Sequence, residues 1–209
     1  MHSGCVAQTS DHWEQTYASR SSTEVSWYER EPTTSLRLIE SLAPVPESAI
    51  IDIGGGTSFL VDRLAARGFT DLTVLDVADH ALSEVRARLG PRAHAATFVH
   101  QDLLTWEPDR QYDIWHDRAV FHFLTDSATR ARYVDIAARA IWHNGALVVG
   151  AFAEDGPTHC SGLPVARYSS DQLASAFSAS FSLIEHEREE HVTPGGVVQP
   201  FTWVTLRRT

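Results

Sequence analysis

The chain has 209 residues, of which 43% are hydrophobic and 21% charged, a composition typical of one globular domain with a sizeable core. Its formal net charge of −10 argues against nucleic acid as a partner, because phosphate binding needs a basic surface. Two cysteines cannot form a disulfide framework, no apolar leader follows Met1, and no apolar run approaches the roughly 18 residues of a membrane span. The sequence therefore predicts a soluble cytoplasmic protein with no nucleic-acid or membrane partner.

The first 45 residues are predicted to form a helical segment ahead of a main domain at residues 46–209. The opening 30 residues are polar, but they contain aromatic residues that a disordered arm usually lacks, namely Trp13, Tyr17, Trp27 and Tyr28. Residues 32–42 begin with a proline and carry apolar side chains at helical spacing. This pattern predicts a helix that ends at the proline-containing stretch 43–48.

Strands and helices alternate from Ala49 onward. Strands are predicted at 49–53, 71–77, 96–102, 112–117 and 146–153, and helices at 58–68, 79–91 and 127–145. We expect Asp79 to cap the second of these helices. Strands that are apolar almost throughout and alternate with helices indicate a parallel sheet covered on both faces.

The end of the chain follows a different pattern. A helix is predicted at 169–180, with a capping box from Ser169 to Gln172. Two strands at 181–192 and 199–208 follow, joined by a Gly-Gly turn, so they are expected to be antiparallel. The predicted fold is α/β: a doubly wound, mostly parallel seven-stranded sheet (Rossmann-like) that ends in an antiparallel hairpin.

Three consecutive glycines, Gly54, Gly55 and Gly56, follow the first predicted strand. In an open α/β sheet, ligands bind beyond the carboxyl ends of the strands, near the point where the strand order reverses. The glycines are explained either by a tight strand-to-helix turn or by close approach of the backbone to a ligand.

Two carboxylates favour the ligand. Asp76 closes the second strand at the spacing expected of a carboxylate that binds both ribose hydroxyls. Asp102 follows the third strand, where it can accept a hydrogen bond from an adenine amino group. Each aspartate alone is equally consistent with a helix cap or a loop residue. Together with the glycines, at three successive strand ends, they indicate an adenosine-type cofactor.

The residues around the glycines argue against a dinucleotide. The last glycine of a G-x-G-x-x-G fingerprint would fall on Phe59, whose ring hinders the close helix–strand approach that seats a pyrophosphate. The preceding Asp52 is unfavourable beside a pyrophosphate but suits a cofactor with a cationic amino group. An NAD-linked oxidoreductase is therefore the less favoured alternative.

The motif Asp52-x-Gly54-x-Gly56 resembles the first motif of the class I S-adenosylmethionine (SAM) methyltransferases, and the resemblance extends from about Ala49 to Arg207. The predicted final hairpin is also typical of that family. The resemblance implies that SAM is the cofactor. It also implies that Gly54 to Gly56 approach its methionine part, that Asp76 holds the ribose and Asp102 the adenine amino group, and that Val77 and Leu103 flank the adenine ring.

Two further stretches, HWEQTY and DIWHDRAVFHF, resemble the thiopurine methyltransferase branch of that family. The resemblance implies that Trp13 and Tyr17 form a lid over the cofactor and that Arg118 lies near cofactor and substrate. The alternative is a helix that simply packs two aromatic side chains on the domain.

Two histidines lie on or just past the fourth strand, His116 and His122. Together with Arg118 they are the catalytic candidates, since an imidazole can deprotonate or orient the methyl acceptor. The alternative is that both imidazoles only line the pocket wall. His116 is also expected to contact the cofactor, and Trp13, Tyr28 and Trp115 are candidates for an aromatic face beside the sulfonium. The sequence contains no metal-binding spacing of histidines or cysteines.

The sequence thus predicts a SAM-dependent methyltransferase acting on a small-molecule acceptor, with sulfur or another soft atom as a candidate nucleophile. A protein lysine methyltransferase is the first alternative, and an open acidic groove would distinguish it from a closed pocket. A SAM-binding module without catalysis is a further alternative.

Overall fold

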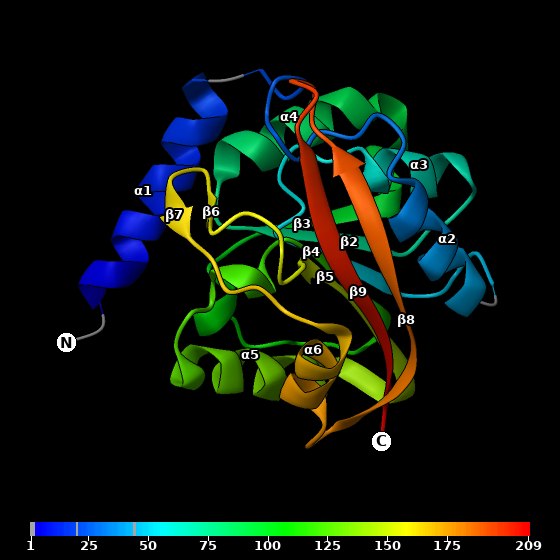
Figure 1. Ribbon diagram of the computed structural model, residues 1–209. Coiled ribbons are helices and arrows are strands. Elements are labelled where there is room, and N and C mark those ends of the chain that lie inside the picture. The colour runs from blue at the N-terminus through cyan, green and yellow to red at the C-terminus, as the bar shows by residue number, and fades with distance from the viewer. Residues whose placement is uncertain (1–2, 20, 44) are drawn as a thin grey trace.

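The computed structural model describes residues 3–19, 21–43 and 45–209, with side chains from residue 10 onward (Figure 1). Its centre is a seven-stranded sheet of order β3-β2-β1-β4-β5-β9-β8. The strands are β1 Ile50–Ile53, β2 Leu72–Asp76, β3 Ala96–His100, β4 Tyr112–Arg118, β5 Ile141–Phe152, β8 Phe181–Val192 and β9 Val198–Arg208. The first five pair in parallel, whereas β9 runs antiparallel to both β5 and β8. The predicted fold class is therefore confirmed.

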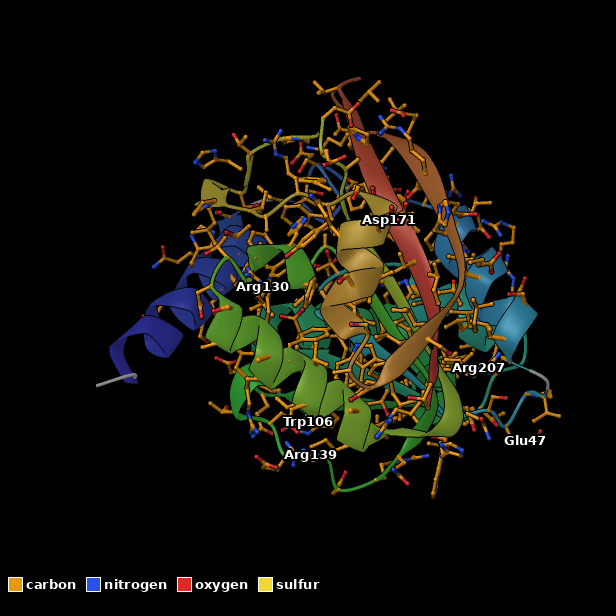
Figure 2. All side chains as sticks on the ribbon, turned by 60° about the horizontal axis from the view of Figure 1, so that its bottom comes forward. Glu47, Trp106, Arg130, Arg139, Asp171 and Arg207 are labelled. Atoms are coloured by element: carbon orange, nitrogen blue, oxygen red, sulfur yellow. The ribbon has the colours of Figure 1, made fainter. Side chains whose placement is uncertain are left out.

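Helices cover both faces of the sheet, as Figure 1 shows. They are α1 Ser3–Ser19, α2 Thr33–Leu42, α3 Leu60–Ala66, α4 Asp79–Leu89, α5 Ser127–Ala140 and α6 Ser170–Phe177, with 3₁₀ turns η1 Gly90–Ala95, η2 Leu103–Thr105 and η3 Phe121–Phe123. Apolar side chains of α5 and α6 form one core with one face of the sheet, and those of α2, α3 and α4 form another with the opposite face. Figure 2 shows α5, which carries Arg130 and Arg139, beside α6, near whose start Asp171 lies.

The strand order places the reversal point between β1 and β4. The chain crosses from β1 outward to β2 and β3, and then returns to the other side of β1 with β4 and β5. In such sheets the loops at the carboxyl ends of the two central strands separate and leave a crevice. The glycine loop after β1 and the residues that follow β4 flank this crevice.

Two predicted details are wrong. Helix α5 ends at Ala140, and β5 begins at Ile141, which pairs with Tyr112 of β4 ahead of a register shift. The predicted helix 127–145 was too long because its helical pattern runs into a strand that starts with a β-branched residue. Asp79 does not cap α4 either: Ala78 occupies that position, and the side chain of Glu14 from α1 accepts from the Asp79 backbone amide at 2.5 Å.

The predicted capping box of α6 is confirmed, with Ser169 and Gln172 exchanging side-chain and backbone hydrogen bonds. Between β5 and α6 the structure adds a small antiparallel pair that the sequence pattern did not predict, β6 His159–Cys160 and β7 Leu163–Pro164. Of the helices in the described ranges, none is long and apolar enough to cross a membrane.

Candidate functional site

The glycine loop connects β1 to α3 at the reversal point of the sheet. Gly54 and Gly56 have positive φ angles of 59° and 50°, which side chains rarely adopt. A Cβ atom on Gly54 would lie 2.2 Å from Cγ2 of Val120, and one on Gly56 would lie 2.2 Å from the hydroxyl of Tyr17. Both positions therefore require glycine, for backbone conformation and for space.

Asp76 joins the ends of β1 and β2. Its carboxylate accepts hydrogen bonds from the backbone amides of Gly56 at 2.7 Å and Ala78 at 2.9 Å. Burial raises the pKa of this carboxyl to about 6. The buried carboxylate is thus bonded to the glycine loop, while its predicted contact with a ribose stays a prediction.

Asp102 lies just past β3, the neighbour of β2. Its side chain caps η2 by accepting from the Leu104 amide at 2.7 Å, which places Leu103 in the first position of that turn. In the parallel register of the two strands, Asp76 is opposite His100. The His100 imidazole is 3.1 Å from the carbonyl oxygen of Val77. The residues predicted to surround adenine thus belong to adjacent strand ends.

Helix α1 lies over the glycine loop. Tyr17 is buried with its hydroxyl against Gly56, and burial, together with the charge of Asp76, raises the pKa of Tyr17 well above its usual value. The Trp13 ring contacts the rings of Tyr17, Trp27 and Phe123 at centroid distances of 5.3 to 6.1 Å. The predicted lid residues therefore cover the candidate site, while closure on a cofactor stays a prediction.

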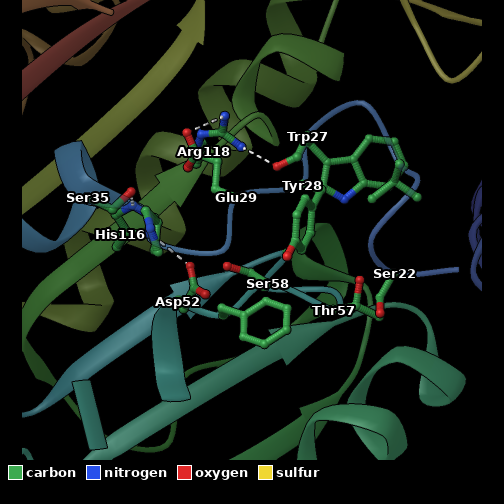
Figure 3. A pocket seen from close by; sticks show the side chains of 15 residues that line it. Ser22, Trp27, Tyr28, Glu29, Ser35, Asp52, Thr57, Ser58, His116 and Arg118 are labelled. Atoms are coloured by element: carbon green, nitrogen blue, oxygen red, sulfur yellow. Dashed lines mark hydrogen bonds and ion pairs between the residues drawn. The ribbon is translucent and has the colours of Figure 1, made fainter. Parts of the chain in front are cut away.

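A pocket opens between the glycine loop and the segment 22–35 (Figure 3). Asp52, Tyr28, His116 and Arg118, all predicted site residues, are part of its wall. The Tyr28 ring packs on Phe59, the residue that replaces the last glycine of a dinucleotide fingerprint, at a centroid distance of 5.9 Å.

His116 bridges two polar side chains on the wall of this pocket. Its Nδ1 lies 2.7 Å from Oδ1 of Asp52, and its Nε2 lies 2.9 Å from Oγ of Ser35 in α2. Sequence reasoning missed Ser35, because a serine in the first turn of a helix usually serves the helix end or faces water. The role of Ser35 becomes clear only from the pairing of β1 with β4, which brings Asp52 beside His116, the hydrogen-bond partner of Ser35.

Arg118 holds the segment that covers the pocket. Its Nη1 donates to the carbonyl oxygen of Trp27 at 3.1 Å, and its Nη2 is 3.4 Å from a carboxylate oxygen of Glu29. The guanidinium also lies over the ring of Phe201, 4.7 Å from its centroid. Arg118 therefore ties β4 to the residues that follow α1.

Two predicted residues lie elsewhere. Trp115 is buried in the core on the α5 side, where its indole donates to the hydroxyl of Tyr133 at 2.9 Å, so it does not face the pocket. Adjacent residues of a strand point to opposite faces, and His116 takes the pocket side. His122 is fully buried between Phe123 and Phe152 and is not part of the pocket wall. Its catalytic role stays a prediction.

Comparison with known proteins finds two matches in sequence. Residues 50–145 match the model of a family described as methyltransferase domain. The mouse protein eEF1A lysine and N-terminal methyltransferase is 28% identical over 122 residues, which are 56% of this chain. The match spans only 17% of the length of that protein.

Solved structures share the fold over nearly the whole chain. The N-methyltransferase NodS from Bradyrhizobium japonicum WM9, in complex with S-adenosylhomocysteine (SAH), is 18% identical. It covers 95% of this chain and 99% of its own, with a TM-score of 0.72. A second solved structure comes from work described as the conversion of a disulfide bond into a thioacetal group during echinomycin biosynthesis, and it is 19% identical. The match covers 95% of this chain and 92% of that one, with a TM-score of 0.76. The chain thus shares the fold of these structures, and the methyltransferase-domain match over residues 50–145 agrees with the predicted resemblance to class I methyltransferases, while the thiopurine branch stays a prediction.

Proposed function

We propose that this chain is a SAM-dependent methyltransferase that acts on a small-molecule acceptor. The observation that carries the proposal is the buried carboxylate of Asp76, bonded to Gly56 at the reversal point of the sheet. Two backbone amides already donate to this carboxylate, and its two oxygens keep further acceptor capacity that suits two neighbouring ribose hydroxyls. The match of residues 50–145 to a methyltransferase domain supports the same assignment.

The residues present fit SAM. The loop Gly54–Gly56 is backbone without side chains, covered by Val120 and Tyr17, and Asp52 before it offers a carboxylate to a cationic amino group. Asp76 would hold the ribose, while Asp102, Val77 and Leu103 would surround the adenine. The aromatic rings of Trp13, Tyr17 and Tyr28 suit a cationic sulfur. When bound, SAM supplies a methyl group on a sulfonium, and the protein has to position the acceptor and exclude water.

The pocket is small and largely covered, which favours a small acceptor. Its wall consists of the glycine loop and the segment 22–35, which Arg118 fastens to β4. The solved structure on disulfide-to-thioacetal conversion keeps sulfur among the candidate acceptor atoms. A thiolate is a soft nucleophile that attacks readily, so alignment alone can supply about 7–11 kcal/mol of the barrier reduction.

A protein lysine methyltransferase is the second candidate. An open groove beside the pocket contains Glu29, Glu31, Glu189 and Glu190, and a lysine side chain would favour such carboxylates. The mouse relative supports this reading by its described activity. Arginines neutralise much of the groove, however: Arg63 and Arg67 pair with Glu31, and Arg188 pairs with Glu190. The small-molecule acceptor is therefore favoured.

Calorimetry with SAH tests the cofactor. We expect the wild-type chain to bind SAH, and Asp76→Asn to bind it roughly 100-fold more weakly, because two charge-assisted hydrogen bonds to ribose are lost. Asp71→Asn is the matched control, since Asp71 precedes the same strand at its other end and pairs with Arg110 on the surface. Binding of NAD in place of SAH by the wild type would overturn the proposal.

Labelled SAM tests the acceptor class. Thiols, chalcogenides, amines and lysine-containing proteins are offered side by side, and we expect the label in a small molecule. Label found only in protein lysine would favour the second candidate. Label in no acceptor, with SAH bound, would indicate a SAM-binding module without catalysis.

A further inference from the structure

Three buried polar side chains form a continuous hydrogen-bonded chain on the pocket wall. Ser35 comes from the first turn of α2, His116 from β4 and Asp52 from β1 (Figure 3). Their exposed fractions are 1%, 2% and 6%. All three residues also line the pocket, so the hydrogen-bonded row reaches the pocket while its side chains stay shielded from bulk water.

The hydrogen bonds among these three side chains run in one direction, from Ser35 through His116 to Asp52. A carboxylate can only accept hydrogen bonds, so the 2.7 Å contact with Asp52 assigns the proton of the neutral imidazole to Nδ1 of His116. Nε2 then carries the lone pair and accepts from the hydroxyl of Ser35 at 2.9 Å. The imidazole is held between these two groups and packs on the ring of Trp203 at a centroid distance of 5.9 Å. This is the arrangement of a hydroxyl activated by an oriented base.

We propose that Ser35, His116 and Asp52 form a proton relay that removes the proton of the methyl acceptor. Ser35 is the group that meets the acceptor, and His116 and Asp52 act through it. The inference rests on the proposed function and defines the acceptor class: a neutral group with an O–H, N–H or S–H proton. An acceptor that enters as an anion does not need the relay.

The proton balance is complete within these residues. As the acceptor gains its methyl group and the methyl–sulfur bond breaks, the acceptor proton moves to Oγ of Ser35. The hydroxyl proton of Ser35 moves at the same time to Nε2 of His116. The resulting imidazolium is stabilised by Oδ1 of Asp52, 2.7 Å from Nδ1, which leaves Oδ2 for the amino group of the cofactor. The other charged groups of the pocket wall, Arg118 and Glu29, pair with each other at 3.4 Å.

The ¹⁵N NMR spectrum of the histidine rings tests the relay without any acceptor or cofactor. We expect His116 of the wild type to carry its proton on Nδ1, and Ser35→Ala to shift its Nε2 resonance. Ser41→Ala is the matched control, because Ser41 lies on the same helix and its hydroxyl donates to the Leu38 carbonyl, away from His116. A wild-type His116 protonated on Nε2 would overturn the relay.

Kinetics with two thiols test the proton transfer itself. The probes are benzyl mercaptan, a neutral thiol at pH 7, and 4-nitrobenzenethiol, an anion at that pH. In Ser35→Ala and His116→Gln we expect kcat for benzyl mercaptan to fall at least about 100-fold with little change in KM, since general-base catalysis contributes about 10²–10⁴-fold. The kcat for 4-nitrobenzenethiolate should fall at least about 10-fold less than the kcat for benzyl mercaptan, because the anion has no proton to lose.

Equal losses with both thiols, or no loss with either, would contradict the relay and indicate a purely structural hydrogen bond. Calorimetry with SAH on the same samples separates the two proposals. Failure of the wild type to bind SAH rejects the cofactor assignment, whereas the histidine tautomer reports on the relay alone.

Discussion

Buried polar side chains gather at the carboxyl end of β4, and their hydrogen bonding differs. The carboxylate of Asp117 accepts from the backbone amides of Val120 and Phe121 and from the hydroxyl of Tyr133 at 2.6 Å. Burial raises its pKa to about 6. These bonds fix the turn after β4, in which Ala119 adopts a φ of 72°. Asp117 therefore shapes the chain that flanks the crevice.

His122, five residues further on, is the opposite case. Within the part of the chain that the structure describes, neither of its ring nitrogens has a hydrogen-bond partner, and its side chain is fully buried. Burial and the charge of Arg118 lower the pKa of this imidazole to about 3. Its ring is therefore neutral at pH 7 and lies between two phenylalanine rings.

Because His122 is buried and neutral, it should make the free energy of unfolding depend on pH. Below pH 6.5 the unfolded-state imidazole takes up a proton, whereas the folded one does not, so the wild type loses stability as the pH falls. His122→Phe lacks this loss. Its free energy of unfolding relative to wild type should rise by about 2 kcal/mol between pH 7 and pH 5.

Urea denaturation at the two pH values measures this difference. His191→Phe is the contrasting control, because the His191 ring bonds Glu29 and the Ser26 carbonyl and its loss should destabilise the fold at pH 7. A pH-independent difference for His122→Phe would show that its imidazole is accessible to protons in the folded state.

Individual site residues could be predicted from the sequence where they belong to a recognisable motif. The glycines, Asp52 and Asp76 follow from a spacing that reflects strand ends. Ser35 carried no signal, since its partner His116 lies 81 positions away and is reached only through the tertiary fold. Trp115 was assigned to the wrong face, because a near-continuous apolar strand does not show which residues point to which helical layer.

Among the elements, α1 determines access to the site. It is held to α4 by Glu14, whose carboxylate accepts from the Asp79 and His80 amides at 2.5 and 3.3 Å. A carboxylate is favourable at the positive end of a helix. One turn further along α1, Tyr17 rests on Gly56. The helix therefore lies across the loop that a cofactor has to reach.

We expect SAH binding to require displacement of α1. In stopped-flow fluorescence, the observed binding rate of the full chain should then level off at high SAH concentration, at the opening rate of the helix. Deleting residues 1–19 should restore a rate proportional to SAH concentration. Trp13→Phe controls for the fluorescence signal, since Trp13 contacts Tyr17 and Trp27. Proportional rates in both chains would exclude a gating role for α1.

Elements with strong local patterns were predicted well, and their boundaries less so. The hairpin of β8 and β9 follows from two apolar-containing runs around a Gly-Gly turn. The end of α5 does not, because the cross-strand pair of Ile141 with Tyr112 decides it. The cap of α4 comes from Glu14, which is distant in sequence, and local rules assigned it to Asp79 instead.

For the whole molecule, the sheet order is the organising feature. It brings the ends of β1, β2, β3 and β4 to one edge, where the sequence had placed glycines, carboxylates and a histidine. The alternation of apolar strands and helices was enough to predict this layout. The family resemblance implied that Trp13 and Tyr17 lie over that edge. The path of the segment 22–35 was not predictable, since it depends on aromatic contacts between distant residues such as Trp13 and Trp27.

A crystal structure of this chain with SAH tests the central claim most directly. The account predicts both ribose hydroxyls about 3 Å from the Asp76 carboxylate, with the adenine amino group at Asp102 and the homocysteine part along Gly54 to Gly56. SAH bound at a different edge of the sheet, or with its ribose away from Asp76, would contradict it.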